Sequence, residues 1–169
     1  KAKAISPTID TVLWESLAKI HLFQNNYDQA HVLYLDILRD EPEHLHALAG
    51  ILDTSIEVDD MNNFLGALEK LLLILDIPVP EKEIESLAEC ATLCMKTATL
   101  LKTNGEKGLA RSLAQIALRL DPSCSDAHLL LADLSTEEND LQQMLQNLES
   151  ALKSGADQEE IMKRIDKAK

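Results

Sequence analysis

Apolar residues recur every three or four positions along most of the chain. Between Thr11 and Pro42 this spacing selects one set of large and small side chains: Trp14, Leu17, Ala18, His21, Tyr27, Ala30, Tyr34 and Ile37. A repeat of three to four residues is typical of amphipathic helices, whereas half-buried strands alternate every second residue. The segment therefore predicts two antiparallel helices that end before Pro42, because proline cannot extend the hydrogen-bond ladder of a helix.

The same pattern returns further along the chain, again ending at a proline, Pro122. Its small residues recur at one constant interval, because Ala98 corresponds to Ala132 and Ala117 to Ala151. This interval, called the period below, is about 34 residues, a length typical of repeated helix pairs. Small residues are needed where two helices approach most closely, so their regular return indicates that the same helix pair is repeated.

A less regular helix pair lies between these two matches. We expect its helices at about Glu43 to Glu57 and Asp60 to Asp76, with Ala67 as the counterpart of Ala30. That pairing exceeds the period by three positions, and the interval from Ala67 to Ala110 exceeds it by nine. The sequence therefore indicates an insertion after this pair.

The extra residues follow the sequence Ile77-Pro78-Val79-Pro80, which ends the preceding helix. From Glu81 to about Thr103 a helical pattern continues without a break. We therefore predict an extension of the next helix at 82–90 that overhangs its neighbours by about two turns. Its apolar stripe is expected to comprise Ile84, Leu87, Cys90, Ala91 and Cys94.

Both ends carry helix signals. Ser6 followed by Pro7 predicts a helix start, and residues 1–6 are expected to be a disordered tail or an expression remnant. Asp157 and Glu160 have the spacing of a capping box, so 157–169 is expected to hold a short capping helix and a tail. Such a helix covers the last exposed face of a repeat array.

These spacings resemble those of the tetratricopeptide repeat family over about residues 7–156. The resemblance implies an all-α fold, a right-handed superhelix (α-solenoid) of about four helix pairs plus the C-terminal capping helix. The repeats are expected at about 11–44, 45–81, 91–124 and 125–156. The chain is further expected to be a fragment of a larger repeat protein, since it begins with Lys1 rather than Met.

The resemblance also implies a concave groove, lined by the first helix of each repeat, that holds a partner's peptide or helix. The corresponding positions are Glu15, Lys19, Leu22, Ala49, Asp53, Ile56, Met95, Thr99, Lys102, Leu129, Asp133 and Thr136. Repeats that clamp the C-terminal carboxylate of the chaperones Hsp70 and Hsp90 need Asn and Lys or Arg there. Because Lys19 occupies an Asn position and Glu15 a Lys position, the sequence argues against that clamp.

Composition narrows the choice of partner. With 16 Lys and Arg against 29 Asp and Glu, the formal charge is −13, which repels nucleic-acid phosphates and anionic membranes. We expect a protein partner, with a basic one favoured by charge, although an acidic surface also serves solubility alone. No apolar run is long enough to cross a bilayer, and three cysteines indicate a reducing compartment, cytoplasmic or nuclear.

Candidate chemistry is sparse. His44 and His46 would point about 200° apart on a helix, so we expect no shared metal site. Cys90 and Cys94 share a face, but within an apolar stripe they are expected to be buried hydrophobes. With no catalytic triad and no phosphate-binding loop, we expect neither an enzyme nor a cofactor.

Two functions remain at this stage. The first is a non-catalytic scaffold, the repeat module of a subunit in a multi-protein complex, which binds a partner segment or subunit. The alternative is a stand-alone peptide-binding chaperone or co-chaperone. Self-association through the exposed end helices is compatible with either.

Overall fold

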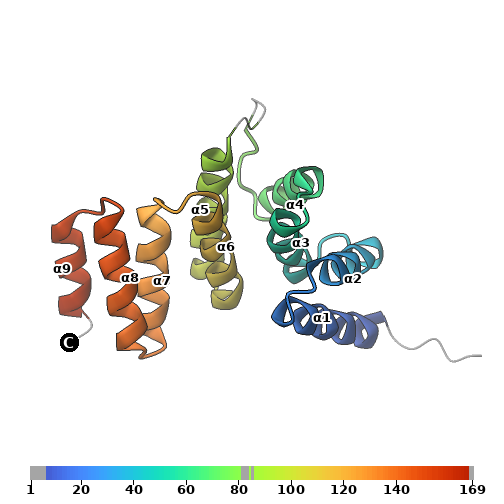
Figure 1. The fold of residues 1–169 in the computed structure, drawn as a ribbon, viewed down its shortest axis with the longest axis horizontal. Coiled ribbons are helices and arrows are strands. Elements are labelled where there is room, and N and C mark those ends of the chain that lie inside the picture. Colours follow the sequence, from blue (N-terminus) through green and yellow to red (C-terminus); the bar gives the residue numbers. More distant parts are fainter. Residues whose placement is uncertain (1–6, 81–83, 85, 168–169) are drawn as a thin grey trace, which may run out of the picture. The chain divides into compact units, whose positions relative to one another are not determined.

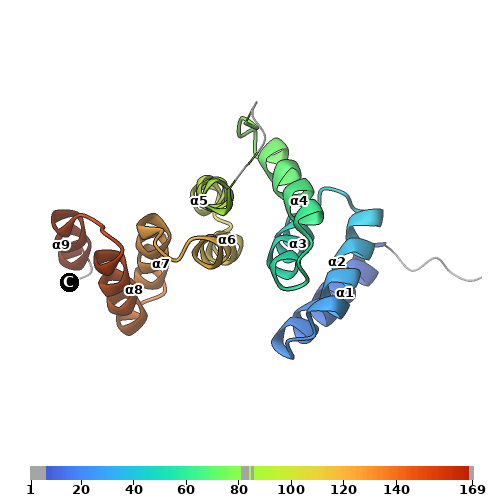
Figure 2. The same ribbon diagram turned by 45° about the horizontal axis from the view of Figure 1, so that its top comes forward.

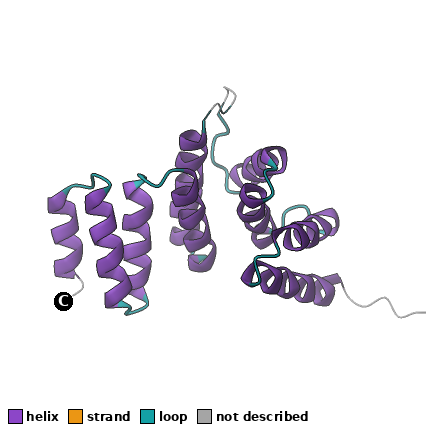
Figure 3. Ribbon diagram, viewed as in Figure 1, coloured by secondary structure: helices purple, strands orange, loops and turns teal. Residues whose placement is uncertain are grey.

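The computed structural model describes residues 7–80, 84 and 86–167. Within this part of the chain there are helices and turns but no strands (Figures 1 and 3). The all-α prediction is therefore confirmed. The chain divides into two compact units, Lys1–Val79 and Pro80–Lys169, which we describe separately. That 7–156 forms one repeat domain stays a prediction.

The first unit contains two helix pairs, α1 (Pro7–Phe23) with α2 (Tyr27–Asp40) and α3 (Leu45–Glu57) with α4 (Met61–Ile74). Helix α2 packs on α3 and joins the pairs. The start of α1 at Pro7 confirms the predicted boundary, whereas Ser6 and the rest of the predicted tail lie outside the described residues. The predicted helices of the second repeat are confirmed to within two residues.

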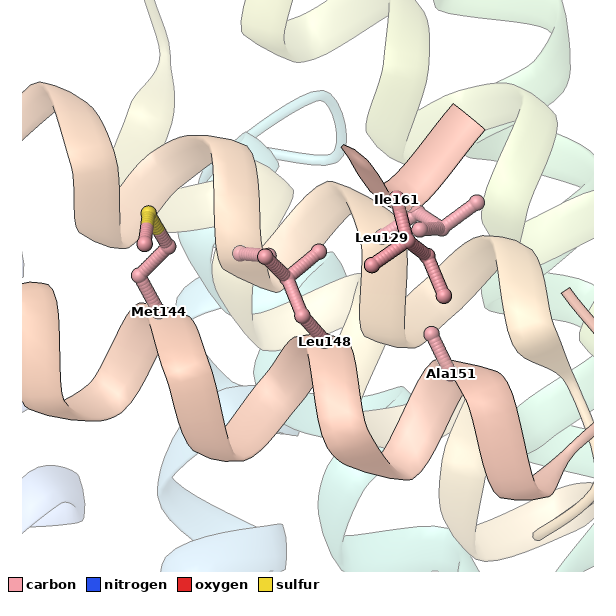
Figure 4. Close-up of a cluster of buried hydrophobic side chains, with 6 residues drawn as sticks. Leu129, Met144, Leu148, Ala151 and Ile161 are labelled. Atoms are coloured by element: carbon pink, nitrogen blue, oxygen red, sulfur yellow. The ribbon is translucent and has the colours of Figure 1, made fainter. Parts of the chain in front are cut away.

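The second unit also contains two helix pairs, α5 (Leu87–Thr103) with α6 (Lys107–Leu120) and α7 (Ser125–Glu137) with α8 (Leu141–Lys153). Helix α9 (Gln158–Lys167) follows and packs beside α8 (Figures 1 and 2). Its Ile161 is buried in a cluster drawn in Figure 4 with residues of α7 and α8, namely Leu129, Ala132, Met144, Leu148 and Ala151. The capping helix expected after Asp157 is therefore present.

The turn between the two helices of each pair shows the length of the repeat. Each first helix ends in a turn whose residue with positive φ is Asn25, Asp59, Gly105 or Asn139. The interval from Asn25 to Asp59 equals that from Gly105 to Asn139, and both equal the period. The first two repeats therefore keep the full period, and the predicted pairing of Ala30 with Ala67 is wrong.

The true counterpart of Ala30 is Phe64, and both are completely buried. A large residue replaces the expected small one, and the nearest alanine in the same helix, Ala67, lies three positions further on. The predicted alanine pairing therefore selected the wrong residue. The interval from Asp59 to Gly105 exceeds the period by twelve positions. Eight of these lie in the connection between α4 and α5, which has 12 residues where the α2–α3 connection has four, and four lengthen α5, which has 17 residues where α3 has 13.

The predicted helical extension at 82–90 is wrong for the described residues that precede Leu87. Ile84 and Ser86 are not helical, and residues 81–83 and 85 lie outside the described residues. Ser86 caps the helix: its Oγ accepts a hydrogen bond from the Glu89 backbone N–H at 3.2 Å, and the Glu89 carboxylate accepts one from the Ser86 N–H. This reciprocal capping box starts α5 at Leu87.

The predicted apolar stripe of α5 is correct from Cys90 onward. Cys90, Ala91 and Cys94 are buried, while Leu87 is half exposed. The small residues that marked the repeat are buried as well, with Ala18, Ala98 and Ala117 completely inaccessible to solvent. These alanines allow close helix approach in the pairs α1–α2 and α5–α6.

Candidate functional site

A groove of about 580 Å³ lies in the second unit. Its lining residues come from the first helices α5 and α7, from the turn before α7, and from the capping helix α9. They are Thr92, Met95, Lys96, Thr99, Lys102, Thr103, Cys124, Asp126, Leu129, Leu130, Asp133, Glu137, Glu160 and Arg164. The size is that of a site for a few side chains of a partner.

Five of the six groove positions predicted in the third and fourth repeats line this groove. Met95 and Leu129 are buried and form its apolar floor, and Thr99 stands on its wall. Lys102 and Asp133, both predicted to line the groove, form an ion pair there. Thr136 does not line the groove, and its hydroxyl donates to the Ala132 carbonyl oxygen at 2.9 Å.

The charged groups of the groove are linked to one another. Asp133 accepts from Lys102 Nζ at 3.2 Å and from Arg164 Nε at 3.0 Å. Arg164 also donates through Nη1 to Glu160 at 2.7 Å. Burial lowers the pKa of Arg164, but the bonds and charges of Glu160 and Asp133 outweigh this and raise it.

The rim continues at the C-terminal end of α7. Glu137 accepts from Lys107 Nζ at 2.8 Å and lies 3.7 Å from Lys102 Nζ. The hydrogen bond from Lys107 is the main reason that the pKa of Glu137 is lowered. The groove therefore has an apolar floor below a rim on which Lys102 and Arg164 are paired with acidic residues.

In the first unit, the predicted groove residue Glu15 is the centre of a polar cluster. Its carboxylate accepts from Lys19 Nζ and lies 3.7 Å from His44 Nε2 and 3.5 Å from His46 Nδ1. Burial raises the pKa of Glu15, but the hydrogen bond from Lys19 and the charges of Lys19, His46 and His44 lower it overall.

The prediction that His44 and His46 point apart is wrong. His44 is not inside the helix but is the N-cap of α3, where its Nδ1 accepts from the Ala47 backbone N–H at 3.1 Å. The angular spacing of helical residues does not apply to an N-cap residue, whose backbone is extended. Both imidazoles therefore reach Glu15, with ring centres 6.1 Å apart.

The other predicted positions of the first unit lie on α1 and α3. Ala49 is buried, and Leu22, Asp53 and Ile56 are half buried. Burial, with the negative charges of Glu15 and Asp53, raises the pKa of the Tyr34 phenol. Both carboxylates therefore lie close enough to the buried Tyr34 hydroxyl to affect its ionisation.

Sequence reasoning missed the residues that α9 contributes. Arg164 lies one period after Leu130, so α9 occupies the place that a first helix has in the repeat, and both residues line the groove. Extending the groove positions by one more period would have reached this helix. Lys96 and Thr92 were missed because they flank the predicted positions on α5.

Cys90 and Cys94 are buried, whereas Cys124 is half buried and lines the groove. Burial raises the pKa of Cys94, and it raises those of Cys90 and Cys124 as well. Across the described part of the chain, no three His, Cys, Asp or Glu side chains are grouped so that they could hold a metal ion. None of the helices within residues 7–80 and 86–167 is both long and apolar enough to span a membrane.

No family model matches the chain. The lipopolysaccharide assembly protein B of Haemophilus influenzae is 30% identical over 144 residues, which are 85% of this chain. The chain spans only 34% of the length of that relative.

Solved structures with a similar helix arrangement include MamA, at 16% identity and a TM-score of 0.45, covering 89% of this chain and 81% of MamA. Pseudomonas aeruginosa PilF is 15% identical with a TM-score of 0.44, covering 97% and 69%. In the Cut9–Hcn1 complex, the match is 13% identical with a TM-score of 0.46, covering 94% and 29%.

The fold itself carries the assignment. Antiparallel helix pairs recur with the same period inside each unit, and buried alanines occupy the close contacts of the repeat. The period and the helix–turn–helix unit are those of the tetratricopeptide repeat. The described helices therefore have the fold of tetratricopeptide repeats.

Proposed function

We propose that the chain is a non-catalytic scaffold that binds a segment of another protein in the groove of the second unit. The observation that carries this proposal is the convergence of Met95, Thr99, Lys102, Leu129 and Asp133 on one groove. These positions are the ones that the resemblance to tetratricopeptide repeats implies for the groove, and they provide an apolar floor below a polar rim. That combination suits a peptide, which needs an apolar pocket for a side chain and polar groups beside its backbone.

The charges favour an apolar anchor over a charged one. Lys102 and Arg164 are each bonded to Asp133, so a ligand carboxylate would have to break existing ion pairs to reach them. Four acidic residues face three basic ones along the lining, which is consistent with a neutral or basic segment rather than an acidic one. Nucleic acid is disfavoured by the charge of −13.

We place this scaffold inside the cell, in the cytoplasm or nucleus, as the repeat module of a subunit in a multi-protein complex. The three cysteines without a disulfide among them fit a reducing compartment. The absence of a metal cluster from the described residues, together with the raised cysteine pKa values, gives no support to a catalytic role.

Peptide selection with a blocked groove tests the proposal. Random peptides displayed on phage are selected on the natural chain, and the affinity of a synthetic selected peptide is measured by fluorescence anisotropy. Thr99→Trp fills the groove from an exposed wall position and should weaken binding at least about tenfold, the effect of losing about 1.4 kcal/mol. The selected peptides should share a large apolar residue.

Ser112→Trp on α6 is the matched control. Like Thr99, Ser112 is exposed on a helix and its hydroxyl donates to the carbonyl oxygen four residues earlier, but it does not line the groove. The proposal is wrong if Thr99→Trp and the natural chain bind the selected peptides equally well, or if Ser112→Trp weakens binding as much.

A further inference from the structure

Two charged side chains in the groove of the second unit have no charged partner. Lys96 on α5 and Asp126 on α7 both line the groove and are exposed. Neither side chain forms an ion pair or a hydrogen bond with any described residue. The other charged lining residues are all in ion pairs, namely Lys102, Asp133, Glu137, Glu160 and Arg164. Lys96 and Asp126 can therefore meet a ligand charge without the loss of an existing ion pair.

The repeat places these two charges on either side of the apolar floor. The first helices of successive pairs are parallel, so residues one period apart lie at the same level along them. Lys96 is level with Leu130, which is four residues, or about 6 Å, beyond Asp126. Met95 and Leu129 of the floor are also level with each other, and Leu129 lies between Asp126 and Leu130 in the chain. A ligand side chain on the floor therefore has Asp126 on one side and Lys96 on the other.

The neighbours of each charge at its own level do not neutralise it. The counterparts of Asp126 are Thr92 on α5 and Glu160 on α9, so none of these three positions is basic. The counterpart of Lys96 on α9 is Arg164, so the level of Lys96 has no acidic residue on these helices. A positive ligand group is therefore favoured beside Asp126 and a negative one beside Lys96.

We infer that the groove takes a segment in which an apolar residue has a Lys or Arg within two positions on one side and an Asp or Glu within two positions on the other. This inference rests on the proposed function of the groove. The basic residue of the segment pairs with Asp126 and the acidic residue with Lys96. The apolar side chain lies between them, on Met95 and Leu129.

The dimensions of an extended segment fit this arrangement. Helix α5 packs beside α7, and packed helices lie about 10 Å apart. With the offset of about 6 Å along the helices, the backbones at Lys96 and Asp126 are roughly 12 Å apart. Four residues of an extended peptide cover about 13 Å, so charged residues two positions on either side of the apolar one reach both groups.

Charge reversal on both sides of the interface tests the inference. The probes are synthetic fluorescein-labelled peptides from the phage selection on the natural chain, restricted to those whose binding Thr99→Trp weakens. They should share the apolar residue with flanking charges of both signs. Asp126→Lys should weaken their binding about tenfold in fluorescence anisotropy, and a peptide with Glu in place of its basic residue should bind this variant as the original peptide binds the natural chain. Lys96→Glu should weaken binding similarly, with Lys in place of the acidic residue restoring it.

Glu149→Lys and Lys153→Glu are the matched controls. Both residues are exposed on α8 and do not line the groove, and the two substitutions change the net charge as Asp126→Lys and Lys96→Glu do. Because solvent and salt screen charges at a distance, both controls should bind within about twofold of the natural chain. Restored binding of an exchanged peptide also shows that the reversed variant is folded.

Several outcomes would overturn the inference and leave the proposed function standing. They are selected peptides without flanking charges, either reversed variant binding as tightly as the natural chain, exchanged peptides that restore nothing, and control variants that weaken binding equally. In each case the loss of binding in Thr99→Trp still supports the groove. If Thr99→Trp weakens no selected peptide, the proposed function and this inference are both wrong.

Discussion

The contact between Gly50 and Tyr34 can be tested by adding a single methyl group. A Cβ at position 50 would lie 2.5 Å from Tyr34 Cζ and 2.6 Å from Tyr34 Cδ2, far inside van der Waals contact. Tyr34 is only 2% accessible, so its rigid ring cannot turn into solvent to make room. Helices α2 and α3 would have to separate slightly.

Two opposing effects set the size of the change. Alanine is favoured over glycine inside a helix by about 1 kcal/mol, whereas overfilling a packed contact costs about 1–3 kcal/mol. Because the clash involves a ring rather than the end of a flexible chain, we expect Gly50→Ala to lower the free energy of unfolding by about 1–2 kcal/mol net. For a unit of this length the melting temperature should fall by about 4–8 °C per kcal/mol.

The measurement is urea unfolding followed by tryptophan fluorescence. Trp14 is the single tryptophan and lies on α1, so its emission reports the first unit. Gly66→Ala in α4 is the matched control, since a Cβ there has no heavy atom within 4 Å, and it should stabilise the unit. A Gly50→Ala chain as stable as the natural one would refute the argument that this glycine is required by the close approach.

Three further results are expected. Burial lowers the pKa of His31 and outweighs the opposing charges of Asp60 and Asp28, so as the pH falls the unfolded chain binds a proton at His31 before the folded chain does. The urea midpoint of the first unit should therefore fall as the pH drops below 6.5. His31→Gln should reduce this pH dependence. Ser86→Ala removes the cap of α5 and should destabilise the second unit by about 1 kcal/mol in thermal unfolding followed by circular dichroism. Phe64→Ala should lower the free energy of unfolding of the first unit by about 3–5 kcal/mol and shift the urea transition seen in Trp14 fluorescence. Leu113→Ala removes a buried side chain of the second unit, so it should lower the stability of that unit by about 2–5 kcal/mol and leave the Trp14 transition unchanged.

Much of the fold could be predicted from spacing because the repeat is encoded in small residues at fixed intervals. Ala98 with Ala132 and Ala117 with Ala151 were paired correctly, since small residues are kept at these close helix contacts in both repeats of the second unit. The groove positions that the tetratricopeptide resemblance implies include five residues of the second unit that line one groove. Positions defined by backbone approach therefore carry over between repeats.

The predictions that were wrong concern positions where one side chain departs from the repeat pattern or caps a helix. Phe64 stands at a position expected to be small, so a search for alanine chose the wrong residue. The start of α5 was missed because the apolar pattern was followed past Ser86 and Glu89, whose capping-box spacing was present in the sequence. Similarly, the angle between His44 and His46 was calculated for a helix that begins only at Leu45.

The turns inside the helix pairs show where this chain could become more stable without any change to its core. Asn25, Asp59 and Asn139 hold a left-handed backbone conformation that glycine adopts without strain, and the third turn, at Gly105, already uses glycine. Replacing these three by glycine would relieve local strain, partly offset by the greater freedom of the unfolded chain. The repeat therefore keeps a reserve of stability in its turns, at positions where natural variation can adjust how firmly each helix pair closes.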